Sequence, residues 1–309
     1  MLPPGWDAAL LASVLGLLIG SFLNVVIHRL PRMLERRWAA DCAELLGHAS
    51  ESGHTNPAAT PAATPAATPA TPSAGTAAAA AEEPFNLMRP RSRCPHCGHA
   101  IAWHENIPVL SYLRLRGRCS ACAAPIGWRY PAVELLTGAL FAACALRWGL
   151  GAQGALWAGF GAALIALAAI DWDTTLLPDD ITLPLLWAGL LATAVGLNAI
   201  TLSDAVWGAA VGYLSLWSVF WGFKLLTDKD GMGYGDFKLF AAIGAWMGWQ
   251  ALIPVLLMAS VVGAVIGIAL KVRGGLREGG VMPFGPFLAL GGLTAMAVGP
   301  QRVLSMMGI

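Results

Sequence analysis

The sequence is dominated by eight apolar stretches, most of which have about the length of a helix that crosses a membrane. Such a helix needs roughly 20 mostly apolar residues to span the hydrocarbon core. The stretches lie near 8–27, 131–149, 153–170, 181–199, 203–223, 237–249, 251–270 and 284–305, and the sixth is the shortest. We therefore predict an all-α polytopic membrane protein with about eight transmembrane helices.

The composition supports this class and excludes others. Hydrophobic residues make up 57% of the 309 residues and charged residues 12%, whereas a soluble domain carries about 25% charged residues. The net charge of +1 offers no basic excess to neutralise phosphates, so we expect no nucleic-acid partner. Six cysteines in a chain of this length do not describe a disulfide-stapled secreted module. The expected surroundings are a lipid bilayer.

The positions of the basic residues predict the orientation of the chain. With the N-terminus outside, the inner segments are 28–130, 171–180, 224–238 and 271–283, and they contain 17 of the 19 Lys and Arg residues. Cytoplasmic segments carry such an excess of basic residues. The sequence therefore predicts that the N-terminus lies outside and that these four segments face the cytoplasm.

The first inner segment divides the chain into parts. Residues 1–28 are the first transmembrane helix, 29–130 are cytoplasmic, and 131–309 form a seven-helix membrane domain. Residues 48–84 include repeated Pro-Ala-Ala-Thr units and an alanine run, where frequent proline blocks a helix, so we expect a disordered insert. Residues 85–130 are polar and rich in Cys, Gly and Arg.

Four cysteines in this last part have the spacing of a zinc site. Cys94 and Cys97 form one Cys-x-x-Cys pair, and Cys119 and Cys122 form a second pair, with 21 residues between the two pairs. Two residues between thiolates let one turn direct both sulfurs at one ion, and Gly98 suits such a turn. The alternatives are a redox dithiol or incidental thiols, although a reducing cytoplasm disfavours disulfides. We predict a small zinc-ribbon-like domain whose Zn²⁺ is structural, because four thiolates leave no open position for water.

The other two cysteines and the three nearby histidines are not expected to be metal ligands. His96, His99 and His104 lie near the pairs, and we expect surface or outer-shell roles for them. Cys42 and Cys144 are expected to be isolated small residues rather than metal ligands.

Two aspartates at the ends of apolar stretches are the candidates for chemistry. Asp171 directly follows the third stretch and Asp236 directly precedes the sixth. The predicted orientation places both at the cytoplasmic side, where they could meet. Two neighbouring carboxylates cannot both ionise easily, so they share a proton and can act as general base and general acid on a peptide bond. A proton relay in a transporter uses the same residue type, so composition alone leaves both functions open.

Neighbouring charged residues have simpler expected roles. Asp179 or Asp180 is expected to cap the helix of the fourth stretch, and Asp173 to face water at the interface. Lys238 could bias the charge of Asp236, but we expect it to extend toward lipid headgroups.

Several motifs resemble those of the type IV prepilin peptidases over nearly the whole chain. These are Gly20-Ser21-Phe22-Leu23-Asn24, Asn106-Ile107-Pro108-Val109-Leu110-Ser111-Tyr112, Arg129-Tyr130-Pro131 with Glu134, Asp171 through Asp179, Gly233-Tyr234-Gly235-Asp236, and Pro283-Phe284-Gly285-Pro286. The fifth resembles the GxGD motif of intramembrane aspartyl proteases. The insert at 48–84 departs from the shorter relatives.

The resemblance implies a bifunctional enzyme of the bacterial inner membrane with a periplasmic N-terminus. It implies removal of the basic leader from type IV prepilins and type II secretion pseudopilins at the cytoplasmic face, with Asp171 and Asp236 as catalytic residues. The four cysteines further imply N-methylation of the new N-terminal residue with S-adenosylmethionine. No Gly-rich dinucleotide-type fingerprint is present, so no residue is predicted for the methyl donor. A membrane-anchored zinc-ribbon adaptor without chemistry remains the third alternative.

Overall fold

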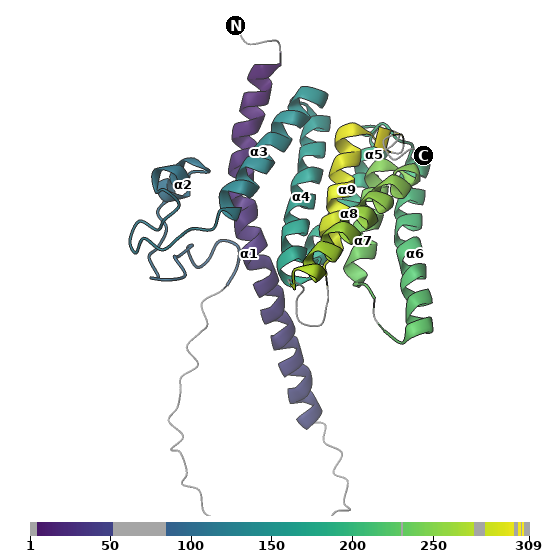
Figure 1. Cartoon of the computed structure of the whole chain (residues 1–309), viewed down its shortest axis with the longest axis horizontal. Coiled ribbons are helices and arrows are strands. Elements are labelled where there is room, and N and C mark those ends of the chain that lie inside the picture. Colours follow the sequence, from purple (N-terminus) through teal and green to yellow (C-terminus); the bar gives the residue numbers. More distant parts are fainter. Residues whose placement is uncertain are drawn as a thin grey trace, which may run out of the picture.

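The computed structural model describes residues 5–51, 85–229, 231–274 and 282–299, together with 302, 303 and 305. In these parts the regular structure is helical, and strand pairing is limited to isolated bridges (Figure 1). The helices are α1 Trp6–Glu51, η1 Trp103–Asn106, α2 Leu110–Arg114, α3 Arg129–Trp148, α4 Ala152–Thr174, α5 Asp179–Ala194, α6 Leu202–Thr227, α7 Tyr234–Met247, η2 Trp249–Ala251, α8 Leu252–Val272 and α9 Gly285–Val298. The predicted insert from 52 to 84 lies outside the described residues, as do 300, 301 and 304 of the eighth apolar stretch.

The predicted all-α polytopic architecture is confirmed, and each apolar stretch coincides with a helix. Among the described residues, five helices are long and apolar enough to cross a membrane: α1, α3, α4, α6 and α8 counted with η2. Helices α5, α7 and α9 have 16, 14 and 14 residues. A 14-residue helix is about 21 Å long, which is less than the roughly 30 Å of hydrocarbon. Counted alone, these three helices are therefore shorter than the hydrocarbon core is thick.

Helix α1 continues well past the predicted end of the first span. It runs for 46 residues, through Pro31, to Glu51. The first transmembrane helix predicted for residues 1–28 is thus the beginning of a longer helix, which also covers residues 48–51 of the expected insert. The reason lies in residues 33–46, which are mostly Ala, Leu, Glu, Arg and Met, the residue types with high helix propensity. Such residues continue a helix in water without an apolar environment.

Glycines four residues apart bring two pairs of helices into backbone contact. A Cβ placed on Gly20 of α1 would lie 2.7 Å from the Cα of Glu134 on α3, and Gly16 has a similar approach one turn earlier. On α6 and α7, Gly208 and Gly244 face each other, and a Cβ on either would lie 2.2 Å from the other's carbonyl oxygen. Small residues at this spacing allow close helix packing in membranes.

Helix α7 lies at the centre of the bundle. All its residues from Phe237 to Met247 except Lys238 are buried. Helices α5, α6 and α9 pack on α7, and α4 packs on α9. Figure 1 shows α1 and α3 on one side of the molecule, with α4 beside them and α5–α9 beyond. This arrangement encloses the beginning of α7, which carries Asp236.

The cysteine-containing segment 85–130 is built from two similar turns joined by η1 and α2. Each turn is closed by an antiparallel bridge, one between Arg93 and Ala100 and one between Arg118 and Pro125. Gly98 and Ala123, four positions after the first cysteine of each pair, both have a positive φ, of 73° and 57°. Their backbone N–H groups donate to the carbonyls of Cys94 and Cys119. The expected turn at Gly98 is confirmed, and the second turn repeats it. In Figure 1 this segment, which carries α2, lies on the opposite side of α1 from the bundle.

Candidate functional site

The four cysteines lie together as a possible metal site. Their Sγ atoms all lie within 4.8 Å of one another, with 3.8 Å between Cys94 and Cys122 and 4.0 Å between Cys97 and Cys119. Tetrahedral coordination with Zn–S bonds of about 2.3 Å would place the sulfurs about 3.8 Å apart. The cluster can therefore hold a metal ion, and its donors and dimensions fit zinc.

The backbone of each turn favours a thiolate on its first cysteine. The N–H of Cys97 is the main hydrogen-bond donor that lowers the pKa of Cys94, to about 7. In the second turn, the N–H of Cys122 lowers the pKa of Cys119 in the same way. Because the thiolate is the form that binds metals, each turn prepares its first cysteine as a ligand.

Glu105 joins the two turns through polar contacts. Its carboxylate accepts the N–H of Ala102 at 2.8 Å and lies 3.2 Å from Nε2 of His99. Hydrogen bonds, first from Ser120 and then from Ala102, lower the pKa of Glu105 to about 2. His99 thus contacts a carboxylate near the cluster, in line with its expected outer-shell role.

Asp171 and Asp236 are brought together inside the bundle. Asp171 lies near the end of α4 and Asp236 in the first turn of α7, and their exposed fractions are 5% and 7%. The two carboxyl groups interact electrostatically. The N–H of Asp236 donates to the carbonyl of Gly233, while its Oδ1 has no hydrogen-bond partner in the part of the chain that the structure describes. A buried oxygen of this kind is costly unless something else binds it.

Leu177 packs between the segments that carry the two aspartates. A Cβ on Gly235, the neighbour of Asp236, would lie 2.6 Å from the Cβ of Leu177. A Cβ on Gly285, the first residue of α9, would lie 2.6 Å from Oδ2 of Asp171 and 3.1 Å from Cδ1 of Leu177. Two glycines therefore leave the space in which Leu177 and the Asp171 carboxylate sit.

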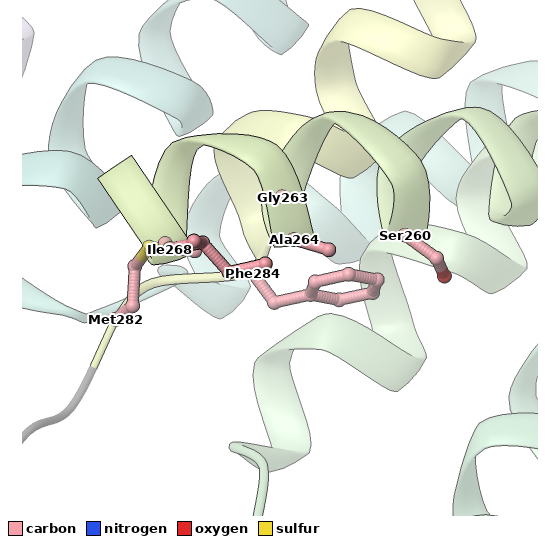
Figure 2. A pocket seen from close by; sticks show the side chains of 7 residues that line it. Ser260, Gly263, Ala264, Ile268, Met282 and Phe284 are labelled. Carbon is pink, nitrogen blue, oxygen red and sulfur yellow. The ribbon is translucent and has the colours of Figure 1, made fainter. Parts of the chain in front are cut away.

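A shallow apolar groove of about 470 Å³ runs beside this site (Figure 2). It lies between α8 and the residues that precede α9, and its lining includes Ser260, Gly263, Ala264, Ile268, Met282 and Phe284. Figure 2 shows the ring of Phe284 extending along α8 toward Ser260. Because Phe284 directly precedes Gly285, the groove adjoins the backbone that contacts Asp171.

Arg129 forms an ion pair with Asp173 at the end of α4. Its Nη1 lies 2.5 Å from both carboxylate oxygens of Asp173, and its Nη2 donates to the carbonyl of Ala169 at 2.9 Å. The side chain of Asp173 is 39% exposed. The expected water-facing position of Asp173 is therefore correct in part, but its carboxylate is paired with an arginine.

The structure contradicts two predictions, one about Lys238 and one about the acids at the start of α5. Lys238 does not extend toward lipid headgroups, because its Nζ contacts both carboxylate oxygens of Asp179 at 2.7 Å. Neither Asp179 nor Asp180 is the N-cap of α5, since Pro178 holds that position and the two acids follow it in the first turn. Carboxylates in a first turn still stabilise a helix through its dipole.

Buried polar side chains attach the cysteine-containing segment to the membrane helices. Arg29 of α1 donates to the carbonyls of Asn86 at 2.9 Å and Pro90 at 2.6 Å. Glu134 of α3 accepts the N–H of Val109 at 2.8 Å. Both charged side chains are 8% exposed. These contacts could not be predicted from the sequence, although a carboxylate inside an apolar stretch, as at Glu134, is a signal that some partner must exist.

Comparisons with known proteins cover nearly the whole chain. Residues 14–148 match the bacterial peptidase A24 N-terminal domain, and residues 158–268 match the type IV leader peptidase family. A prepilin leader peptidase/N-methyltransferase of Burkholderia pseudomallei strain 1026b is 49% identical over 99% of this chain and 90% of its own length. Proteins of the same name from Stutzerimonas stutzeri and Pseudomonas aeruginosa are 48% and 47% identical, over 96% and 93% of this chain and 92% and 89% of their own lengths. No solved structure matches. The chain belongs to the type IV leader peptidase family.

Proposed function

We propose that this protein is an aspartic endopeptidase that removes the leader from type IV prepilins and type II secretion pseudopilins, and that it then methylates the new N-terminus. The observation that carries the proposal is the pair of buried carboxyl groups of Asp171 and Asp236, which interact electrostatically. Relatives that match this chain over nearly its full length carry both activities in their name.

Asp171 and Asp236 are the proposed catalytic residues. One carboxylate takes a proton from a water molecule, whose oxygen attacks the carbonyl carbon of the scissile peptide bond. The other carboxyl group, which holds the shared proton, donates it to the carbonyl oxygen. When the resulting tetrahedral species collapses, the C–N bond breaks and the leaving nitrogen takes up a proton. The products are the free leader and a mature chain with a new amino terminus.

The second reaction uses that amino terminus. The neutral amine attacks the methyl carbon of S-adenosylmethionine, so that an N–C bond forms while the S–C bond breaks, and the amine then loses a proton. The methyl donor is the proposed co-substrate.

Zinc is the proposed resident metal of the four cysteines. Cys94, Cys97, Cys119 and Cys122 would hold it, since their Sγ separations match a tetrahedral site. The ion would supply a structural cross-link between the two turns. Metal analysis of the purified protein, expected to give about one zinc per chain, tests this assignment.

The proposed location is the bacterial inner membrane, with the N-terminus in the periplasm and both sites at the cytoplasmic side. The support is the excess of basic residues in the four inner segments. The apolar side chains exposed on α1, α6 and α8, such as Leu11, Val206 and Val265, are proposed to contact lipid.

The deciding experiment incubates the purified protein with a prepilin, with and without S-adenosylmethionine, and reads the products by mass spectrometry. Wild type is expected to release the leader in both cases and to add the mass of a methyl group only with the donor. Asp171→Asn and Asp236→Asn are expected to abolish cleavage while the protein still inserts. Asp228→Asn, the same change at an exposed acid that ends α6, is the control. Wild-type cleavage by either of the first two variants would contradict the assignment of that residue.

A further inference from the structure

Arg129 contacts the turn of α4 that carries Asp171, and it does so on the face of the helix that is opposite to Asp171. The guanidinium contacts Asp173 and the carbonyl of Ala169, which lie two residues after and two residues before Asp171. Successive residues of an α-helix are about 100° apart, so each of these positions lies about 160° around the helix from Asp171. Asp171 therefore faces the bundle interior, while Arg129 binds the back of the same turn.

This turn lies at the end of a helix, where an external contact adds to its stability. Helix α4 ends at Thr174, and the N–H of the C-cap residue Thr175 donates to the carbonyl of Asp171, while the carbonyls that follow have no partner within the helix. Helix ends fray for this reason. A carboxylate in the last turn, such as Asp173, is also unfavourable beside the negative end of the helix dipole. The guanidinium of Arg129 offsets that charge and donates a further hydrogen bond to the backbone at Ala169.

The backbone of Arg129 is itself held on two sides. Arg129 is the first residue of α3 and follows Pro125, which closes the second cysteine turn, by four positions. The next carbonyl, that of Tyr130, accepts a hydrogen bond from Nδ2 of Asn24 on α1 at 3.0 Å. The guanidinium thus extends from a backbone anchored to the metal-binding segment and to α1.

We propose that Arg129 is a positioning residue for the peptidase reaction. It fixes the last turn of α4 and so sets the Asp171 carboxylate against Asp236. This inference rests on the proposed function, in which these two aspartates cleave the prepilin. Arg129 does not act on the substrate, and its removal should slow the reaction without weakening substrate binding.

The test compares arginine variants at the two ends of α3. Arg129→Gln is expected to lower kcat for prepilin cleavage about tenfold or more and to leave KM within about twofold, since only the alignment of Asp171 changes. Arg129→Lys should restore part of kcat, because an ammonium can pair with Asp173 but lacks the fork that also reaches Ala169. Arg147→Gln is the matched control. Arg147 lies in the last turn of α3, at the other end of this helix from Arg129, and donates to the carbonyl of Met296 at 3.0 Å. The kcat of Arg147→Gln should therefore stay at the wild-type value.

A double variant and a substrate-free measurement complete the design. Asp173→Asn combined with Arg129→Gln should be no slower than Arg129→Gln alone, because Arg129→Gln already removes the ion pair that Asp173→Asn would break. Amide hydrogen exchange at residues 171–175 should become faster in Arg129→Gln but not in Arg147→Gln. The proposal is overturned if Arg129→Gln raises KM at unchanged kcat, if both arginine variants lower kcat equally, or if exchange in α4 is unaltered. If the wild-type protein cleaves no prepilin, the proposed function fails, and the exchange experiment still decides the role of Arg129.

Discussion

Leu177 shows how single residues can set the geometry between the two aspartates. Its side chain fills the space that Gly235 and Gly285 leave open, and these glycines lie beside Asp236 and Asp171 respectively. A side chain at either glycine would therefore meet Leu177, and at Gly285 it would also meet a carboxylate. By contrast, a Cβ on Gly233 in the same motif would meet only Oδ2 of Asp236, at an ordinary contact distance of 3.9 Å.

This difference predicts unequal effects of alanine within one motif. Gly235→Ala and Gly285→Ala are expected to lower prepilin cleavage at least tenfold, because the added methyl group displaces Leu177 or the Asp171 carboxylate. Gly233→Ala, at a backbone φ of −81° that any residue adopts, should cost far less. Initial rates of cleavage by the purified variants measure the effect. If Gly233→Ala and Gly235→Ala lowered the cleavage rate equally, the space around Leu177 could not explain why glycine is needed at Gly235.

At the residue scale, the cysteines and aspartates of the candidate sites were easier to predict from the sequence than the residues that contact them. The cysteine cluster was predictable because each pair of ligands lies on one short turn, so spacing alone directs the sulfurs. Asp171 and Asp236 were identified because an acid beside an apolar stretch needs a reason. The partner of Asp173 was not predictable, since Arg129 is 44 positions away and a charge in a sequence does not name its counterpart.

At the level of helices, the contact between α6 and α7 leaves no room for added volume. Gly208 and Gly244 touch through their backbones, and Gly212 packs against the carbonyl of Phe240 and the Cα of Ala241 on the same helix, α7. Because α7 carries Asp236 and is buried along its length, this contact helps to hold one aspartate in place.

Gly208→Ala is therefore expected to destabilise the protein by about 1–3 kcal/mol, the range for an overpacked core. Its Cβ would lie 2.2 Å from the carbonyl oxygen of Gly244, so the two helices must move apart. Gly222→Ala, on the same helix with no atom within 4 Å of the new Cβ, should be neutral or slightly stabilising because alanine is the better helix former. Thermal unfolding of the two variants in the same detergent measures the difference. A Gly208→Ala protein as stable as Gly222→Ala would contradict this packing.

The presence of the helices was largely predictable, because each apolar stretch is longer than a typical β-strand. The residues at which the helices end were harder to predict. Residues 33–46 were predicted only as part of the cytoplasmic segment, and α1 continues through them to Glu51 because polarity does not oppose a helix. Helices α5, α7 and α9 end before their apolar stretches do, for a related reason. Hydropathy continues past the last helical residue, whereas the turns after α7 and α9 have glycines with positive φ, at Gly248 and Gly299, that end the helices.

At the scale of the whole molecule, the distribution of Lys and Arg residues predicts how the chain is oriented in the membrane. The cysteine cluster and Asp236 lie in inner segments that carry Lys and Arg, Asp171 interacts with Asp236, and only Arg147 and Arg302 lie outside the inner segments. The positive-inside rule then places both proposed reactions on the cytoplasmic side. A substrate with an apolar helix in the bilayer could present its cleavage site there and, after cleavage, its new amino terminus to the same face.

Cysteine labelling in spheroplasts tests this orientation. Cys42 lies on the exposed extension of α1, which is expected in the cytoplasm, so an impermeant maleimide should label it only after lysis. A cysteine introduced as Gly151→Cys occupies the turn between α3 and α4, which is expected outside and has no atom within 4 Å of the new Cβ. It should be labelled in intact spheroplasts. Cys144, which is 1% exposed, should resist the reagent in both states and serves as the control for unfolding. Labelling of Cys42 before lysis, with Gly151→Cys protected, would reverse the orientation and move both proposed sites to the periplasmic face.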